Sequence, residues 1–255
     1  MKRNTSVWIL GLLVAVLAAL PATAKQTERW TNEYPLSAGG RLSVDNVQGS
    51  IWVEGWDRAE VELTVKKSAE GARARLSDAE VIVESQRDSL AVETRYTGNS
   101  EEPVAVDYCL RVPRQVRLDG LRTVNGDITV RNVEGFIDAQ TLNGNVKQTG
   151  VAGSVLAHTV NGSIDVAVRA LPEAPGELHL ETINGDLRLL LPAAANAELE
   201  LSTVAGRILS DLPAPARVLA GDTSSARARL GRGGVSIRLR TIRGNIEITE
   251  SDDLL

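Results

Sequence analysis

Apolar and polar residues alternate along most of the chain from residue 25 onward. The alternation is clearest after residue 122, where a Thr-x-Asn-Gly phrase begins at Thr123 and returns at Thr141, Thr159 and Thr182. Side chains of a β-strand alternate between its two faces, so this pattern predicts strands. The recurrence of one phrase predicts that these strands belong to a structural repeat.

The repeat has a regular length in the middle of the chain. The glycines of the phrase, Gly126, Gly144 and Gly162, follow one another at equal intervals, and Gly135 and Gly153 lie halfway between them. Farther along, the intervals from 162 to 185 and from 206 to 244 are longer, which predicts inserted loops. Two strands in each of the equal intervals would form one flattened coil.

Asn-Gly between apolar residues is a strong hairpin signal. A hairpin at Asn125-Gly126, however, would place Val124 and Ile128 on opposite faces. A strand that continues through Gly126 gathers these apolar residues on one face. We therefore predict strands that run through the glycines and stack in parallel as coils. Such glycines imply either a positive φ or a close approach of two backbones, and the sequence leaves both open.

The predicted fold class is all-β: a single-chain β-solenoid of stacked two-strand coils of about 18 residues, with a less regular β-rich N-terminal portion. The expected organisation is a signal peptide at 1–24, the N-terminal β-rich portion at 25–121, the glycine-marked repeats at 122–250 and a C-terminal tail at 251–255.

The first residues predict export. Lys2 and Arg3 precede an uncharged, mostly apolar run at 7–20, and the small residues Ala22-Thr23-Ala24 follow it, as in a secretory signal peptide. The run is shorter than the ~20 residues of a membrane-spanning helix. We expect a periplasmic or cell-surface protein without a transmembrane segment in its mature chain; an uncleaved N-terminal anchor is the alternative.

Composition narrows the function classes. The chain has 28 basic and 33 acidic residues, so its net charge of −5 argues against a nucleic-acid partner. Cys109 is the single cysteine, which excludes an intrachain disulfide.

Three sequence features point to a known group. Repeated Val-x-Gly-x-Ile units follow the predicted signal peptide, residues 49–56 read Gly-Ser-Ile-x-Val-x-Gly-Trp, and Leu-Arg-Val-Pro at 110–113 precedes the repeats. In these features the chain, from about 42 to 248, resembles the putative adhesin family of bacterial envelope domains of unknown function, related to autotransporter-adhesin-like head domains. The resemblance implies surface adhesion or scaffolding and brings no catalytic residues with it.

The polar face of the predicted strands is a candidate ligand face. In stacked coils its residues would form threonine and asparagine ladders that either bind a ligand or only stabilise the stack. The ladder residues are Thr123, Asn125, Thr141, Asn143, Thr159, Asn161, Thr182 and Asn184.

Two further sets of residues are candidates for binding. The segment 217–243 is rich in arginine with Asp222 as its one acid, which indicates either an edge-protecting face or a patch for an anionic partner. The candidate patch is Arg227, Arg229, Arg232, Arg238, Arg240 and Arg243. Aromatic residues bind sugars or lie under a cap, and the candidates here are Trp52, Trp56 and Phe136.

Catalytic chemistry has little support in the sequence. The two histidines, His158 and His179, show no metal-ligand spacing. Asp127 and Asp186 would lie three coils, or about 14 Å, apart, too far for a glycosidase pair. We expect no catalytic residues, no metal and no cofactor.

The predicted function is therefore an exported, non-enzymatic, adhesin-like binding or scaffolding module of the bacterial cell envelope. Its expected partners are envelope polysaccharide, anionic lipid headgroups or another envelope protein. A polysaccharide-active lyase or hydrolase with a site across a corner, and a purely structural or assembly protein, are the alternatives.

Overall fold

The computed structural model describes residues 25–70, 75–97, 104–173, 175–193, 195–212, 217–219 and 224–251. Regular structure in these segments is β-strand, apart from a short 3-10 helix at Leu76–Asp78. The all-β prediction is thus confirmed. The predicted signal peptide, 1–24, lies outside the described residues, as do 252–255 of the predicted tail. No helix in the described segments is long and apolar enough to span a membrane.

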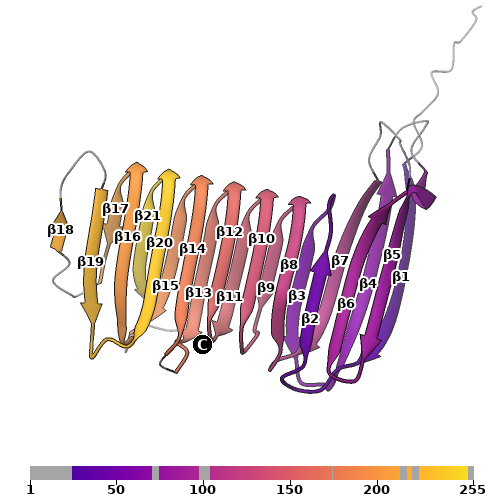
Figure 1. The fold of residues 1–255 in the computed structure, drawn as a ribbon, viewed down its shortest axis with the longest axis horizontal. Helices are drawn as coiled ribbons and strands as arrows, with labels where there is room; N and C mark the ends of the chain where they lie inside the picture. Colours follow the sequence, from indigo (N-terminus) through magenta and orange to yellow (C-terminus); the bar gives the residue numbers. More distant parts are fainter. Residues whose placement is uncertain are drawn as a thin grey trace, which may run out of the picture.

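The strands form two large sheets that share one core (Figure 1). Sheet A has ten strands in the order β1 (Gln26–Pro35), β4 (Glu60–Ala69), β7 (Val104–Pro113), β3 (Ile51–Trp56), β9 (Ile128–Arg131), β11 (Val146–Ala152), β13 (Ile164–Ala170), β15 (Leu187–Pro192), β21 (Ile246–Ser251) and β17 (Ile208–Ser210).

Sheet B has eleven strands. From the C-terminal end of the stack to the N-terminal end, they are β18 (Arg217–Leu219), β19 (Ser224–Leu230), β16 (Ala197–Ala205), β20 (Val235–Arg243), β14 (Glu177–Asn184), β12 (Val155–Asn161), β10 (Ile137–Asn143), β8 (Arg117–Asn125), β2 (Arg41–Asp45), β6 (Ser89–Tyr96) and β5 (Ala79–Gln86).

From β8 to β15 the chain alternates between the two sheets. Each strand pairs in parallel with its equivalent one repeat later, so that Ile137 of β10 lies beside Val155 of β12, and Val146 of β11 beside Ile164 of β13. Figure 1 shows these strands side by side along the long axis of the molecule. Equivalent residues of successive repeats consequently form straight columns.

The last two strands break the sequential order. β20 lies between β14 and β16, and β21 lies between β15 and β17, so the final pair of strands is inserted into the stack. Strand β19 then pairs antiparallel with β16 and covers its edge. The long interval between Gly206 and Gly244 therefore contains a chain reversal and an insertion as well as loops.

The Asn-Gly phrases lie at a corner between the sheets. β8 ends at Asn125 in sheet B, and β9 begins at Ile128 in sheet A. The prediction that one strand runs through the glycine is therefore wrong. The chain changes sheets there, which resets the alternation: Thr123 is buried, whereas Leu142, in the position after the threonine, is exposed.

Close backbone approach explains the glycines of this corner. A Cβ atom on Gly144 would collide with the carbonyl oxygen of Gly126, and one on Gly162 with that of Gly144. At the opposite corner Gly135 and Gly153 have φ angles of 132° and 122°, which disfavour other residues. A Cβ atom on Gly153 would also collide with the carbonyl oxygen of Gly135. Both explanations that the sequence left open thus apply, and at the opposite corner they apply together.

The N-terminal portion has a polar group inside its core. Asn46 lies in register with the repeat threonines, and its Nδ2 donates to the carbonyl oxygen of Val106 at 2.9 Å. The Thr94 hydroxyl donates to Asn46 Oδ1 at 2.9 Å and lies 2.6 Å from the Tyr108 hydroxyl. Burial raises the pKa of Tyr108 to about 12. These bonds join β6, β7 and the corner after β2.

Candidate functional site

Three regular rows of side chains lie at the Asn-Gly corner and on the outer face of sheet B next to it. We call the first, at the corner itself, the amide ladder: Asn125, Asn143, Asn161 and Asn184. The second, the apolar stripe, consists of Val47, Val124, Leu142, Val160, Ile183, Ile242 and Val204. The third, the polar row, consists of Asp45, Arg122, Gln140, His158, Glu181, Arg240 and Ser202.

The predicted threonine face is not at the surface. Thr123, Thr141, Thr159 and Thr182 are at most 6% exposed. Each hydroxyl donates to the carbonyl oxygen of a glycine in the neighbouring coil, as Thr159 does to Gly144 at 2.9 Å. The expectation that these threonines point outward is therefore wrong, because each satisfies a backbone acceptor at the corner.

The asparagines, in contrast, form the predicted ladder near the surface. Nδ2 of Asn143 donates to Oδ1 of Asn125 at 2.8 Å, Asn161 donates to Asn143 at 2.8 Å, and Asn184 donates to Asn161 at 2.9 Å. The Arg243 guanidinium ends the series by donating to Oδ1 of Asn184 at 3.2 Å. Because a side-chain amide has two N–H donors, each ladder bond leaves one N–H for another partner.

A second polar ladder lies just beyond the corner glycines. The backbone N–H of Asn145 donates to Asp127 Oδ1 at 2.7 Å, and that of Asn245 donates to Asp186 Oδ1 at 2.7 Å. Between them, the backbone N–H of Ser163 donates to Asn145 Oδ1 at 2.9 Å. These side chains therefore tie successive coils together.

The apolar stripe collects most of the exposed apolar side chains. Of the six large apolar residues that are exposed in the described segments, five belong to it: Val47, Leu142, Ile183, Val204 and Ile242. The sixth, Leu209, is in β17 of sheet A. The sequence signal was present, since the residue between Thr and Asn is always Val, Leu or Ile. The prediction of a strand that continues through the glycine placed this residue in the core.

The two histidines meet on this face, one in the polar row and one beside it. The rings of His158 and His179 are 5.2 Å apart, and Glu181 Oε2 lies 3.8 Å from His158 Nδ1 and 3.7 Å from His179 Nε2. Burial lowers the pKa of His179, and the neighbouring His158 ring and Arg238 act in the same direction, whereas the Glu181 carboxylate opposes them. The segments that the structure describes contain no group of three or more side chains suited to a metal ion.

The candidate arginine patch is a mixed surface. Arg227 pairs with Glu200 and Arg229 with Glu198, each at 2.7 Å. Arg238 lies 3.8 Å from Glu200. These glutamates lie outside the segment 217–243, on β16, and strand pairing brings them beside the arginines. The local charge of the segment therefore overstated the positive charge of the surface.

The remaining patch residues take separate places. Arg240 belongs to the polar row, and Arg243 ends the amide ladder. At Arg232 the backbone N–H donates to Oδ1 of Asn196 at 2.7 Å.

The candidate aromatic residues are divided between the sheets. Trp52 and Trp56 belong to β3 of sheet A, whereas Phe136 directly precedes β10 of sheet B. Trp56 Nε1 donates to the Glu60 carbonyl oxygen at 2.8 Å, and the Arg117 guanidinium lies 4.8 Å from the centre of the Phe136 ring. The three side chains therefore do not form one sugar platform.

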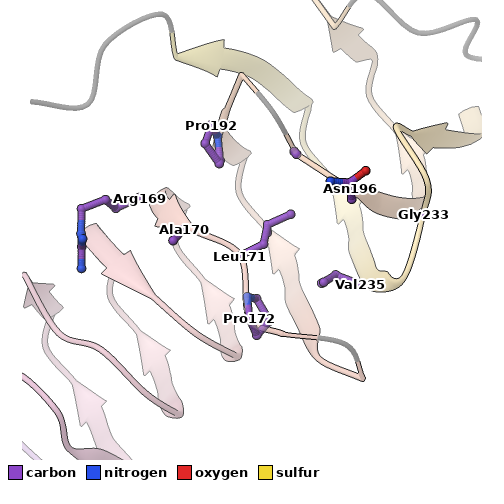
Figure 2. Close-up of a pocket in the computed structure, with 9 residues that line it drawn as sticks. Arg169, Ala170, Leu171, Pro172, Pro192, Asn196, Gly233 and Val235 are labelled. Carbon is purple, nitrogen blue, oxygen red and sulfur yellow. The ribbon is translucent and has the colours of Figure 1, made fainter.

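A cavity of about 430 Å³ lies at the loop end of the coils (Figure 2). Its walls come from the ends of β13 and β15 and the segments that begin β16 and β20, with Leu171, Pro172 and Val235 among them. The charged residue among the described lining residues, Arg169, forms an ion pair with Glu134. The cavity thus offers polar and apolar contacts in about equal measure.

Comparisons with solved structures give distant likenesses. A putative cell adhesion protein from Clostridium sporogenes is similar over 89% of this chain and 100% of its own, with 9% identity and a TM-score of 0.48. A putative lipid binding protein from Parabacteroides distasonis (11% identity, TM-score 0.29) and a putative adhesin from Bacteroides fragilis (12%, 0.28) each cover 88% of this chain and 97% of their own.

No family model matches the chain, and no curated protein does. At such low identities and TM-scores, the function has to be inferred from the chain's own residues.

Proposed function

We propose that this chain is an exported, adhesin-like β-solenoid that binds a linear, hydroxyl-rich polymer of the cell envelope without cleaving it. The signal-peptide pattern at 1–24 and the resemblance to envelope adhesin domains support export and binding. The ligand class that fits best is an envelope polysaccharide lying along the amide ladder, with the repeats at 122–250 as the binding region.

The amide ladder is the observation that carries this proposal. Asn125, Asn143, Asn161 and Asn184 present the same group at successive coils, about 4.8 Å apart. Their mutual hydrogen bonds fix the orientation of each amide, so little side-chain entropy is lost on binding. Each keeps one N–H that can donate to a hydroxyl or ring oxygen. Equal donors at equal steps suit a ligand that itself repeats.

The carboxylates near the ladder support binding over hydrolysis. Asp127 and Asp186 each accept a backbone N–H of the neighbouring coil, so both carboxylates are engaged in tying the coils together. The polymer would be held by many weak, similar contacts, as in multivalent recognition.

The test is binding of the mature chain to a panel of envelope polysaccharides, with product analysis for every glycan. The double variant Asn143→Ala/Asn161→Ala is expected to weaken binding at least tenfold. Asn32→Ala, an exposed asparagine on β1, is the matched control and is expected to bind as the unchanged chain does. Thermal unfolding of each variant would show that it is folded.

Three outcomes would contradict the proposal. Cleavage of any glycan would indicate the lyase or hydrolase alternative. Binding that survives the double variant would place the ligand elsewhere, and no binding to any glycan would favour a structural or assembly role.

A further inference from the structure

We infer that the outer face of sheet B is also a self-association surface, on which two copies of this chain pair face to face with their stacks antiparallel. This inference goes beyond the proposed polysaccharide binding and uses different residues. It rests on the apolar stripe and on the order of charges in the polar row beside it.

The apolar stripe is long, continuous and partly exposed. From Val47 to Ile242 it crosses six neighbouring strands of sheet B. Side chains such as Leu142 (43% exposed) and Ile183 (38%) stand in line at successive strands. The stripe would therefore be about 25–30 Å long. Exposed apolar residues are common singly, but a contiguous row with polar rims is typical of an interaction surface.

A second copy fits this row by simple symmetry. A two-fold axis parallel to the strands and between β10 and β12 reverses the order of the coils and keeps every row opposite its own equivalent. Leu142 of one copy then faces Val160 of the other, and Val124 faces Ile183. The two stripes would cover each other from Val47 to Ile242, while Val204 on β16 lies beyond the overlap.

The polar row is self-complementary around the same axis. Arg122 of one copy would face Glu181 of the other, and Asp45 would face Arg240, while Gln140 would face His158. Each charged pair occurs twice in the dimer because the axis relates the two copies. The charge order therefore provides four intermolecular attractions in this single arrangement.

Neighbouring registers bring like charges together. If the axis moves half a coil toward the C-terminal end, Arg122 faces Arg240. If it moves half a coil toward the N-terminal end, Asp45 faces Glu181. Like charges in an interface cost free energy and exclude wrong partners. The polar row thus specifies one register among those that the apolar stripe would allow.

The expected dimer is weak. Six strands about 4.8 Å apart and two rows about 7 Å apart give roughly 400 Å² per copy, or about 800 Å² in total. This is smaller than the interfaces of stable complexes, so assembly is expected to be transient and to depend on concentration in the micromolar range or above.

Sedimentation equilibrium of the mature chain from about 5 to 500 µM tests the inference. The unchanged chain is expected to shift from monomer to dimer over this range. Leu142→Lys is expected to weaken dimerisation at least tenfold, since the lysine would face Val160 of the second copy. Leu209→Lys is the matched control, because Leu209 is exposed but lies outside the stripe; it is expected to leave dimerisation unchanged.

Charge reversal tests the register. Arg122→Glu and Glu181→Arg are each expected to weaken the dimer, and the double variant is expected to restore it. Monomer at every concentration, a dimer that Leu142→Lys leaves intact, or no restoration in the double variant would overturn the inference. These variants leave the four ladder asparagines in place, so failure here is distinguishable from failure of polysaccharide binding.

Discussion

At the scale of single residues, Gln148 is the clearest departure from a simple core. It is completely buried on β11, and its neighbours on the adjacent strands are Val130 and Val166. Within the part of the chain that the structure describes, neither its Oε1 nor its Nε2 has a hydrogen-bond partner. A buried amide without partners costs about 1–3 kcal/mol. Nothing in the sequence explains a glutamine in this column.

Replacing Gln148 with leucine is therefore expected to stabilise the fold by about 1–2 kcal/mol, because an apolar side chain of similar size removes the unpaired amide. In a chain of this size that corresponds to a rise in Tm of several degrees. Lys147→Leu, at the neighbouring exposed position, is the control and is expected to change the free energy of unfolding by less than about 0.5 kcal/mol. Calorimetry of the three proteins would measure this, and a lower Tm for Gln148→Leu would show that the amide has an essential role.

At the scale of elements, the corner is built by repeated hydrogen bonds between coils. The threonine hydroxyl of each Thr-x-Asn-Gly phrase holds the glycine carbonyl of the neighbouring coil, as Thr159 holds Gly144 at 2.9 Å. Valine has the same shape without the hydroxyl, so Thr159→Val would leave that carbonyl without this donor. We expect a loss of about 1 kcal/mol in the free energy of unfolding.

A serine at this position keeps the hydroxyl and removes only the methyl group. It therefore distinguishes the contribution of the hydrogen bond from that of side-chain packing. Thr159→Ser is expected to lose only the methyl contribution, and denaturant titration of both variants compares the two. If Thr159→Val proved as stable as the unchanged chain, the hydroxyl bonds would have no part in holding the coils together.

The same corner marks the limit of what the sequence could predict. The alternation identified the strands, the parallel columns and the asparagine ladder, because period-two burial and the regular spacing of the glycines are local signals. The alternation failed at Thr123 and Leu142, because the polar threonine is buried and the apolar leucine is exposed. A buried threonine is stable because its hydroxyl donates a hydrogen bond to a carbonyl of another coil. An exposed leucine is recognisable only once the position of the corner is known. The insertion of β20 and β21 depends on pairing between distant segments, for which the sequence contained no signal.

At the scale of the whole molecule, the stack is quasi-one-dimensional, because each strand pairs only with its neighbours in the sheet. Local stability in such an architecture depends on position in the stack, and the end strands open most easily. Sheet A ends on one side in β17, which has three residues, and sheet B ends in β18, which also has three. Among the strands that the structure describes, each of these two has a neighbour on one side only.

The insertion of β20 and β21 predicts that hydrogen exchange follows the position of a strand in the sheet and not its position in the sequence. Strands β20 and β21 are the last in the chain, yet each pairs on both sides. Their backbone amides are therefore expected to exchange with deuterium more slowly than those of β17 and β18, which come earlier in the sequence but end the sheets. Hydrogen exchange followed by mass spectrometry of peptides covering 205–212, 217–219 and 235–250 measures this order. Faster exchange in β20 and β21 than in β17 would mean that the coils stack in the order of the sequence, and it would contradict the insertion. Slow exchange in β20 and β21 would show that the chain protects its C-terminal strands by placing them inside the stack.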